Sequence, residues 1–72
     1  MKIKVKQNYF TEKHFYGNNF LQLPPNATIT DAIDASNIPD VGFVLLNGIV
    51  ASHDTVLQDG NEIEFHATIL GG

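Results

Sequence analysis

The two ends of the chain show the alternation of apolar and polar positions that is typical of β-strands. Residues 2–9 place Ile3, Val5 and Tyr9 on one face and three lysines on the other. Residues 62–69 alternate without interruption. Because the side chains of a strand point alternately to its two faces, both segments are predicted to be half-buried strands.

A short helix is predicted near the middle of the chain. Thr28 and Asp31 have the spacing of a capping box, in which each side chain accepts a hydrogen bond from the backbone N–H of the other residue. The apolar residues that follow Thr28 recur on one helical face, and they are Ile29, Ala32 and Ile33. We expect the helix to end before Pro39, because the residue that precedes a proline is displaced from the helical region.

Three further short apolar segments complete the pattern. Residues 20–23 form a predicted strand that two prolines end, and residues 43–46 form a continuous apolar run. Asn47-Gly48 separates this run from residues 49–50, and an Asn-Gly pair between apolar runs favours a tight hairpin turn. The order strand, strand, helix, strand, strand, strand predicts an α+β roll, with a mixed four- to five-stranded sheet packed on one short helix.

Composition and charge narrow the range of functions. The chain has 72 residues, which suits the single domain predicted over 1–72, and it has no cysteine, which excludes disulfides and thiolate metal sites. All four lysines lie within the first 13 residues, and the acidic remainder has neither lysine nor arginine, which argues against nucleic-acid binding. No apolar run is long enough to span a membrane, and the alternating N-terminus is unlike a signal peptide. We therefore expect a soluble cytoplasmic protein.

The side chains offer little for catalysis. His14, His53 and His66 lack the spacing of a metal site, and Ser36 and Ser52 lack the sequence context of a nucleophile. The sequence has no glycine-rich loop suited to binding phosphate. We therefore expect no enzyme activity, no metal and no bound cofactor.

The C-terminal sequence Leu70-Gly71-Gly72 is the feature that points to chemistry. The last predicted strand leads into it without a linker, and glycines, which lack a Cβ atom, can thread a narrow channel. The reactive group of such a tail is the terminal carboxylate of Gly72. A carboxylate becomes a good electrophile when ATP converts it to an acyl-adenylate. The chain is therefore expected to be a substrate of an ATP-using enzyme rather than a catalyst.

Four segments together resemble a known family. They are residues 23–28 leading into the helix, residues 47–48, residues 57–63 before the last strand, and residues 71–72. In this order and spacing they resemble the ubiquitin-like sulfur carriers, namely the small subunit of molybdopterin synthase and the sulfur carrier of thiamine biosynthesis. The length of the 8–19 segment favours the molybdopterin type.

The resemblance implies a β-grasp fold with the first and last strands parallel at the centre of the sheet. It also implies that an adenylating enzyme similar to ubiquitin-activating enzymes uses ATP to activate Gly72, with Gly71 and Leu70 as the threading tail. A sulfur donor would then convert the adenylate to a thiocarboxylate. The sulfur would pass to a pterin precursor on a large synthase subunit, or to a thiazole precursor on thiazole synthase.

A docking face for a partner is predicted on the sheet. A sheet covered by one helix should be polar on its other face, yet the segment before the hairpin turn is apolar throughout. Counting back from the turn puts Val44 and Leu46 inside. Phe43 and Leu45 then lie outside, where His66 of the last strand would join them. Exposed apolar groups beside a reactive tail indicate a surface that binds a partner.

Two other functions remain open. The chain could be a protein modifier, with the Gly72 carboxyl ligated to lysines of other proteins; it would share the activation step with a sulfur carrier and differ in the acceptor. It could instead be a non-covalent β-grasp binding module, in which the two glycines are incidental.

Overall fold

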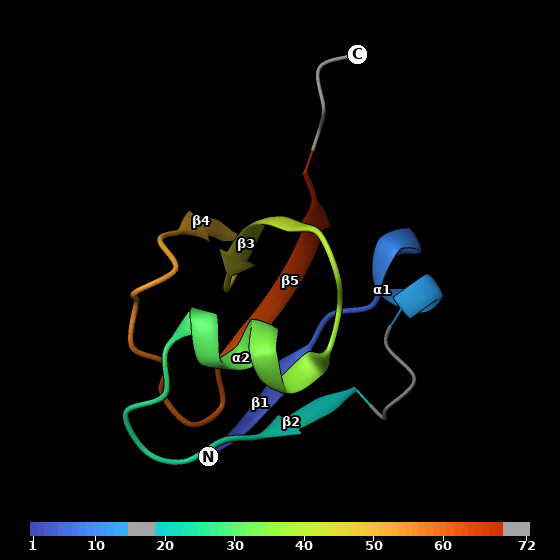
Figure 1. The fold of residues 1–72 in the computed structure, drawn as a ribbon. Helices are drawn as coiled ribbons and strands as arrows, with labels where there is room; N and C mark the ends of the chain where they lie inside the picture. Colours follow the sequence, from blue (N-terminus) through green and yellow to red (C-terminus); the bar gives the residue numbers. More distant parts are fainter. Residues whose placement is uncertain (15–18, 69–72) are drawn as a thin grey trace.

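The computed structural model describes residues 1–14 and 19–68, except for the side chain of His14. Seven elements follow one another along the chain (Figure 1). They are β1 (Lys2–Val5), α1 (Tyr9–His14), β2 (Phe20–Gln22), α2 (Ile29–Ser36), β3 (Val41–Leu46), β4 (Ile49–Ala51) and β5 (Glu62–Ala67).

The five strands form one mixed sheet in the order β2-β1-β5-β3-β4. β1 and β5 are parallel, with Lys4 paired with Glu62 and Val5 with Ile63. The other neighbouring strands are antiparallel. β5 is therefore the central strand, and the ribbon shows it beside β1 through the middle of the molecule (Figure 1). The predicted parallel pairing of the first and last strands is confirmed.

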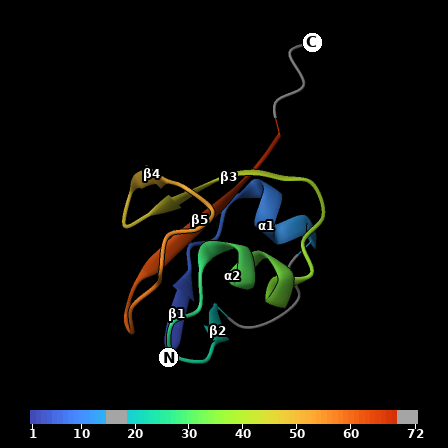
Figure 2. The ribbon, with the colours of Figure 1, turned by 60° about the vertical axis from the view of Figure 1, so that its left-hand side comes forward.

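One face of the sheet packs against α2, which crosses it in Figures 1 and 2. The fully buried residues of the core come from the sheet, from α2 and from the loop before β5. The sheet supplies Ile3, Val5, Val44, Ile63 and Phe65, α2 supplies Ile29 and Ala32, and the loop supplies Leu57. The side chains from β1, β5 and α2 are apolar positions of the predicted alternating strands and of the predicted helical face, whose third residue, Ile33, is partly buried. Val44 comes from the predicted continuous apolar run, and Leu57 comes from a loop.

The bounds of α2 follow from its two ends. Thr28 and Asp31 form the predicted capping box, since each side chain accepts from the backbone N–H of the other residue. At the other end Asn37 adopts the left-handed conformation, with φ 57°, and its N–H donates to the carbonyl of Asp34. The short helix predicted before Pro39 is confirmed.

The hairpin between β3 and β4 also agrees with the sequence. Asn47 and Gly48 have φ of 51° and 88°, the two positive values that a tight hairpin turn requires. As a result, Leu46 pairs with Ile49 across the turn.

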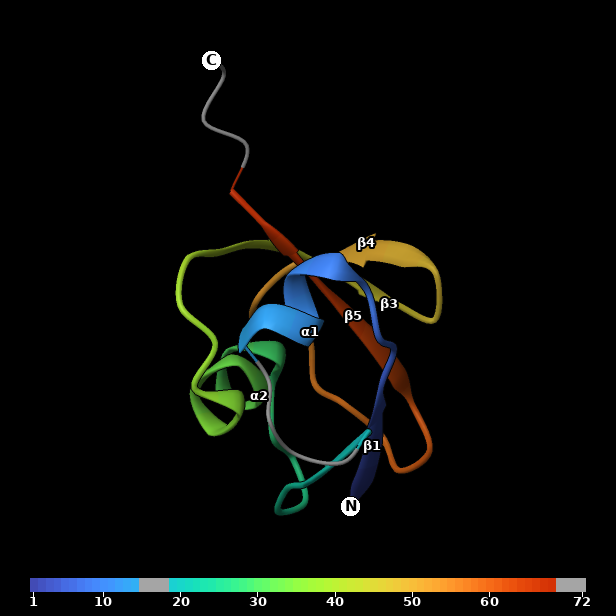
Figure 3. The ribbon, with the colours of Figure 1, turned by 90° about the vertical axis from the view of Figure 1, so that its right-hand side faces the viewer.

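The first strand is shorter than predicted, and α1 was not predicted. β1 ends at Val5, and Tyr9 begins α1 with 74% of its surface exposed rather than lying on the inner face. The cause is Asn8, whose Oδ1 accepts a hydrogen bond from the backbone N–H of Thr11 at 2.8 Å and so caps the helix. Figure 3 shows α1 beside the last part of β5. The last strand is also shorter than predicted, since β5 ends at Ala67 and Thr68 lies outside it. The turn predicted around residues 17–19 lies mostly outside the described residues.

Gly42 allows β3 and the end of β5 to approach closely. The register of the two strands shifts between Val41 and Phe43. A Cβ atom at Gly42 would lie 2.5 Å from Cα and 2.7 Å from the backbone N of Thr68. These distances are too short for any side chain, so the backbone next to the C-terminal tail requires glycine at this position.

We predict that Gly42→Ala lowers the free energy of unfolding by about 1–3 kcal/mol, the usual effect of overpacking. Urea denaturation of the variant and the wild type measures the difference. Adding Thr68→Ala tests the cause, because it removes the Oγ1 atom 2.9 Å from the added Cβ and leaves the backbone atoms in place. We expect little rescue. Full rescue would show that the Thr68 side chain, and not the backbone, sets the requirement for glycine.

Candidate functional site

The pairing of β3 with β5 brings the predicted docking residues together. Phe43 lies opposite His66, and Leu45 lies opposite Glu64. Val44, between them, is fully buried against the core, so Phe43 and Leu45 are on the face of the sheet away from α2. The predicted placement of these side chains is confirmed; their role in docking stays a prediction.

The rings of Phe43 and His66 are stacked. Their centroids are 4.7 Å apart and their planes differ by 3°. The side chain of His66 is 32% exposed, so one part of it supports Phe43 and another part is accessible to a partner. The two rings form a flat aromatic surface across the strands β3 and β5.

Glu64 links this surface to the segment between β1 and α1. Its carboxylate lies 3.8 Å from Nζ of Lys6 and 3.4 Å from Nδ2 of Asn8. Nε2 of His66 is also 2.9 Å away, but the two groups are not aligned for a hydrogen bond. The side chain of Glu64 is 17% exposed. The carboxylate thus has cationic and amide neighbours at the polar edge of an otherwise aromatic face.

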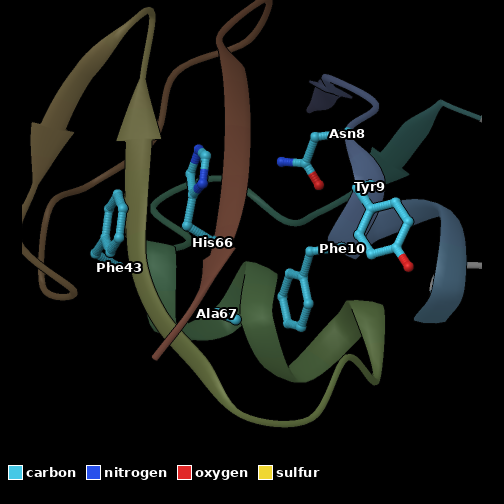
Figure 4. A pocket seen from close by; sticks show the side chains of 6 residues that line it. All are labelled: Asn8, Tyr9, Phe10, Phe43, His66 and Ala67. Carbon is cyan, nitrogen blue, oxygen red and sulfur yellow. The ribbon is translucent and has the colours of Figure 1, made fainter. Parts of the chain in front are cut away.

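A groove of about 350 Å³ lies between α1 and the stacked rings (Figure 4). It is lined by Asn8, Tyr9, Phe10, Phe43, His66 and Ala67. Sequence reasoning missed the side contributed by α1. The available signal was Asn8, a residue of the type that caps helices, three positions before Thr11.

Val50 is a second residue that sequence reasoning missed. Val50 lies on β4 and pairs with Leu45 of the neighbouring strand β3. Its surface is 64% exposed. A two-residue hairpin turn at Asn47-Gly48 sets this pairing, so the register could have been read from the sequence. The apolar part of the face therefore extends from His66 across Phe43 and Leu45 to the edge strand.

The predicted reactive residues Gly72 and Gly71, and Leu70 with them, lie outside the described residues. The structure does show where the tail starts. Thr68 follows the central strand β5, and its N–H donates to the carbonyl of Asp40 at 3.2 Å. An extended chain of four residues spans at most about 14 Å. Gly72 therefore lies within about 14 Å of Thr68.

The remaining ionisable groups do not form a second centre. Within residues 1–14 and 19–68, no three His, Cys, Asp or Glu side chains are placed to hold a metal ion. The pKa of the Asp54 carboxyl is lower than its ordinary value. The larger cause is a hydrogen bond from the Ser52 hydroxyl, and the smaller is a hydrogen bond from the backbone of Asp54 itself. Asp54 is fully exposed. The residue before it, His53, accepts a hydrogen bond at its carbonyl from the hydroxyl of Thr30 in α2. No described helix is long and apolar enough to cross a membrane.

Comparison with known proteins identifies the fold. Neither a protein-family model nor a curated protein matches the sequence. The crystal structure of SAMP1 from Haloferax volcanii does match, with a TM-score of 0.66 over 99% of this chain and 97% of that chain. The chain has the ubiquitin-like β-grasp fold. The sequence identity is 21%, so the likeness establishes the architecture, and the function has to be argued from the chain itself.

We predict that Leu45→Asp weakens binding to the adenylating enzyme expected from the sequence by about tenfold or more, because it places a charge within the apolar surface. Titration of the enzyme with each variant measures the dissociation constant. Val56→Asp is the matched control, since Val56 is 53% exposed and lies outside the strands of this face. Equal affinity of the Leu45→Asp variant and the wild type would remove Leu45 from the docking face.

Proposed function

We propose that this chain is a ubiquitin-like sulfur carrier. The observation that carries the proposal is the combination of a β-grasp fold with the sequence Gly71-Gly72 close after its central strand, β5. Glycines at these positions can enter a narrow active-site channel while the folded domain remains outside it. The domain would position the tail, and the partner enzyme would supply the catalytic groups.

The reaction has two steps. A carboxylate oxygen of Gly72 attacks the α-phosphorus of ATP on the adenylating enzyme, and pyrophosphate leaves. A hydrosulfide-level sulfur donor then attacks the acyl carbon of Gly72, and AMP leaves as the carbon–sulfur bond forms. The product is a thiocarboxylate, and no change of oxidation state is needed because the donor supplies sulfur as sulfide. ATP is used by the partner, and the carrier itself would need no bound cofactor or metal.

The described surface supports recognition by such an enzyme. Phe43, Leu45 and Val50 provide an apolar area on the face away from α2, and His66 provides a flat ring beside it. Apolar and aromatic groups of this kind form the energetic centre of protein interfaces. The area adjoins the end of β5, so an enzyme bound there would have its active site within reach of the tail.

The destination of the sulfur distinguishes two pathways. A large synthase subunit would transfer it to a pterin precursor, and thiazole synthase would transfer it to a thiazole precursor. The long 8–19 segment, part of which forms α1, favours the pterin pathway.

Protein modification is the second candidate function. SAMP1, which shares the fold, is a ubiquitin-like small archaeal modifier protein. A modifier would pass through the same adenylate, and the acyl carbon of Gly72 would then be attacked by the amine of a lysine on another protein. The two functions are compatible with the same docking face and differ only in the nucleophile.

Mass spectrometry of the intact chain tests the carrier function. After incubation with ATP, a sulfide donor and the adenylating enzyme of the same organism, we expect a mass gain equal to replacing one oxygen by sulfur. The variant that lacks Gly72 is the control and should show no gain. If an active enzyme leaves the mass of the wild type unchanged, the chain is not a sulfur carrier.

Blots of cell extract test the modifier function. An N-terminally tagged chain that modifies proteins should give a ladder of larger bands, and the ladder should vanish when Gly72 is deleted. A binding module predicts something different, since the deletion would then leave the function intact. A sulfur carrier without modifier activity gives a single band in both cases.

A further inference from the structure

The hydrogen bonds between β1 and β5 continue beyond the end of β1 through a side chain. The backbone N–H groups of Lys4 and Lys6 donate to the carbonyls of Asn61 and Ile63, at 2.9 and 2.8 Å. In a parallel ladder the next donor in this series is the backbone N–H two residues later, and the next acceptor is the carbonyl of Phe65. At this point the chain has left the sheet, and Nδ2 of Asn8 donates to that carbonyl instead, at 2.8 Å.

The other end of the same side chain starts α1. Oδ1 of Asn8 accepts from the backbone N–H of Thr11 at 2.8 Å and from its Oγ1 at 2.9 Å. The backbone donor holds Oδ1 toward α1 without help from the hydroxyl, so Nδ2 faces β5. Because Thr11 is fully buried, this end of the contact is shielded from water. Asn8 therefore joins α1 to the last part of β5, beside which β1 has already ended.

We propose that Asn8 is a positioning residue for the activation of Gly72. It holds the last part of β5, from which the tail departs, and one wall of the groove beside it. This inference rests on the proposed function. Phe65, the acceptor of its hydrogen bond, immediately precedes His66 and Ala67, which line the groove. Gly72 lies four residues after Thr68, so the direction of β5 at this point limits where its carboxylate can meet ATP.

Asn8→Asp separates this role from the capping of α1. The aspartate keeps an oxygen for Thr11, but it places its second oxygen against the carbonyl of Phe65 and the carboxylate of Glu64. Thr11→Val is the matched control. It removes the hydroxyl bond to Oδ1 and leaves the amide bond to β5 intact.

The experiment combines kinetics with hydrogen exchange. In ATP–pyrophosphate exchange by the adenylating enzyme, Asn8→Asp should lower kcat by about tenfold with KM within about twofold, because the docked tail is misplaced. Thr11→Val should leave both values near those of the wild type. The Thr68 amide of Asn8→Asp should also exchange faster relative to the Leu57 amide, which bonds to Ala27 on the other side of the core.

Each outcome decides the proposal. An unchanged kcat in Asn8→Asp overturns it, and so does an equal loss in Thr11→Val, which would indicate a general effect of α1. If Asn8→Asp does not fold, seen as lost protection at Leu57, Asn8→Ser replaces it, since serine can cap the helix but does not supply the amide donor. A wild-type chain that the enzyme does not activate refutes the proposed function. An activated wild type with an unaffected Asn8→Asp refutes only the role of Asn8.

Discussion

The parallel pairing of β1 with β5 is the interaction on which the rest of the structure depends. Parallel strands cannot be joined by a tight turn, so the chain between them must cross over the sheet, and α2 covers one face as it does so. β2 attaches to β1, and β3 with β4 attaches to β5. Ile3, Val5, Ile63 and Phe65 from this central pair are all fully buried, so the sheet and the core have a common centre.

The features that the sequence predicts well are those set by neighbouring residues. The capping box at Thr28 and the turn at Asn47-Gly48 are local, and alternation alone identifies the buried side of β5. The start of α1 also has a local signal, the cap that Asn8 forms with Thr11, and the sequence reasoning missed it. The contact of Asn8 with the carbonyl of Phe65 is different, because the two residues are far apart in the chain. The docking residues on β3 followed from the hairpin register. The groove wall formed by Tyr9 required the tertiary structure.

The open face of the sheet has two parts with different physical character. Along β1 and the residue that follows it, Lys4 lies 3.5 Å from Glu62 and Lys6 lies 3.8 Å from Glu64, so lysines face the glutamates of β5. Ion pairs at the surface contribute little to stability, but the two exposed lysines keep this half hydrated. The half on β3 and β4 is apolar. A partner can therefore remove water from one half at low cost while the other half fixes its orientation through charge.

The place of β5 in the sheet has a consequence for the synthesis of the protein on the ribosome. β5 emerges after the other four strands, yet it lies at the centre of the sheet. Until it emerges, β1 with β2 and β3 with β4 lack the strand that joins them in the sheet, and its long-range contacts must wait for its synthesis. The strand that completes folding is also the strand that leads to the glycine tail. A chain truncated before β5 would thus lack both a finished fold and the tail, so only chains that contain both could enter the proposed activation reaction.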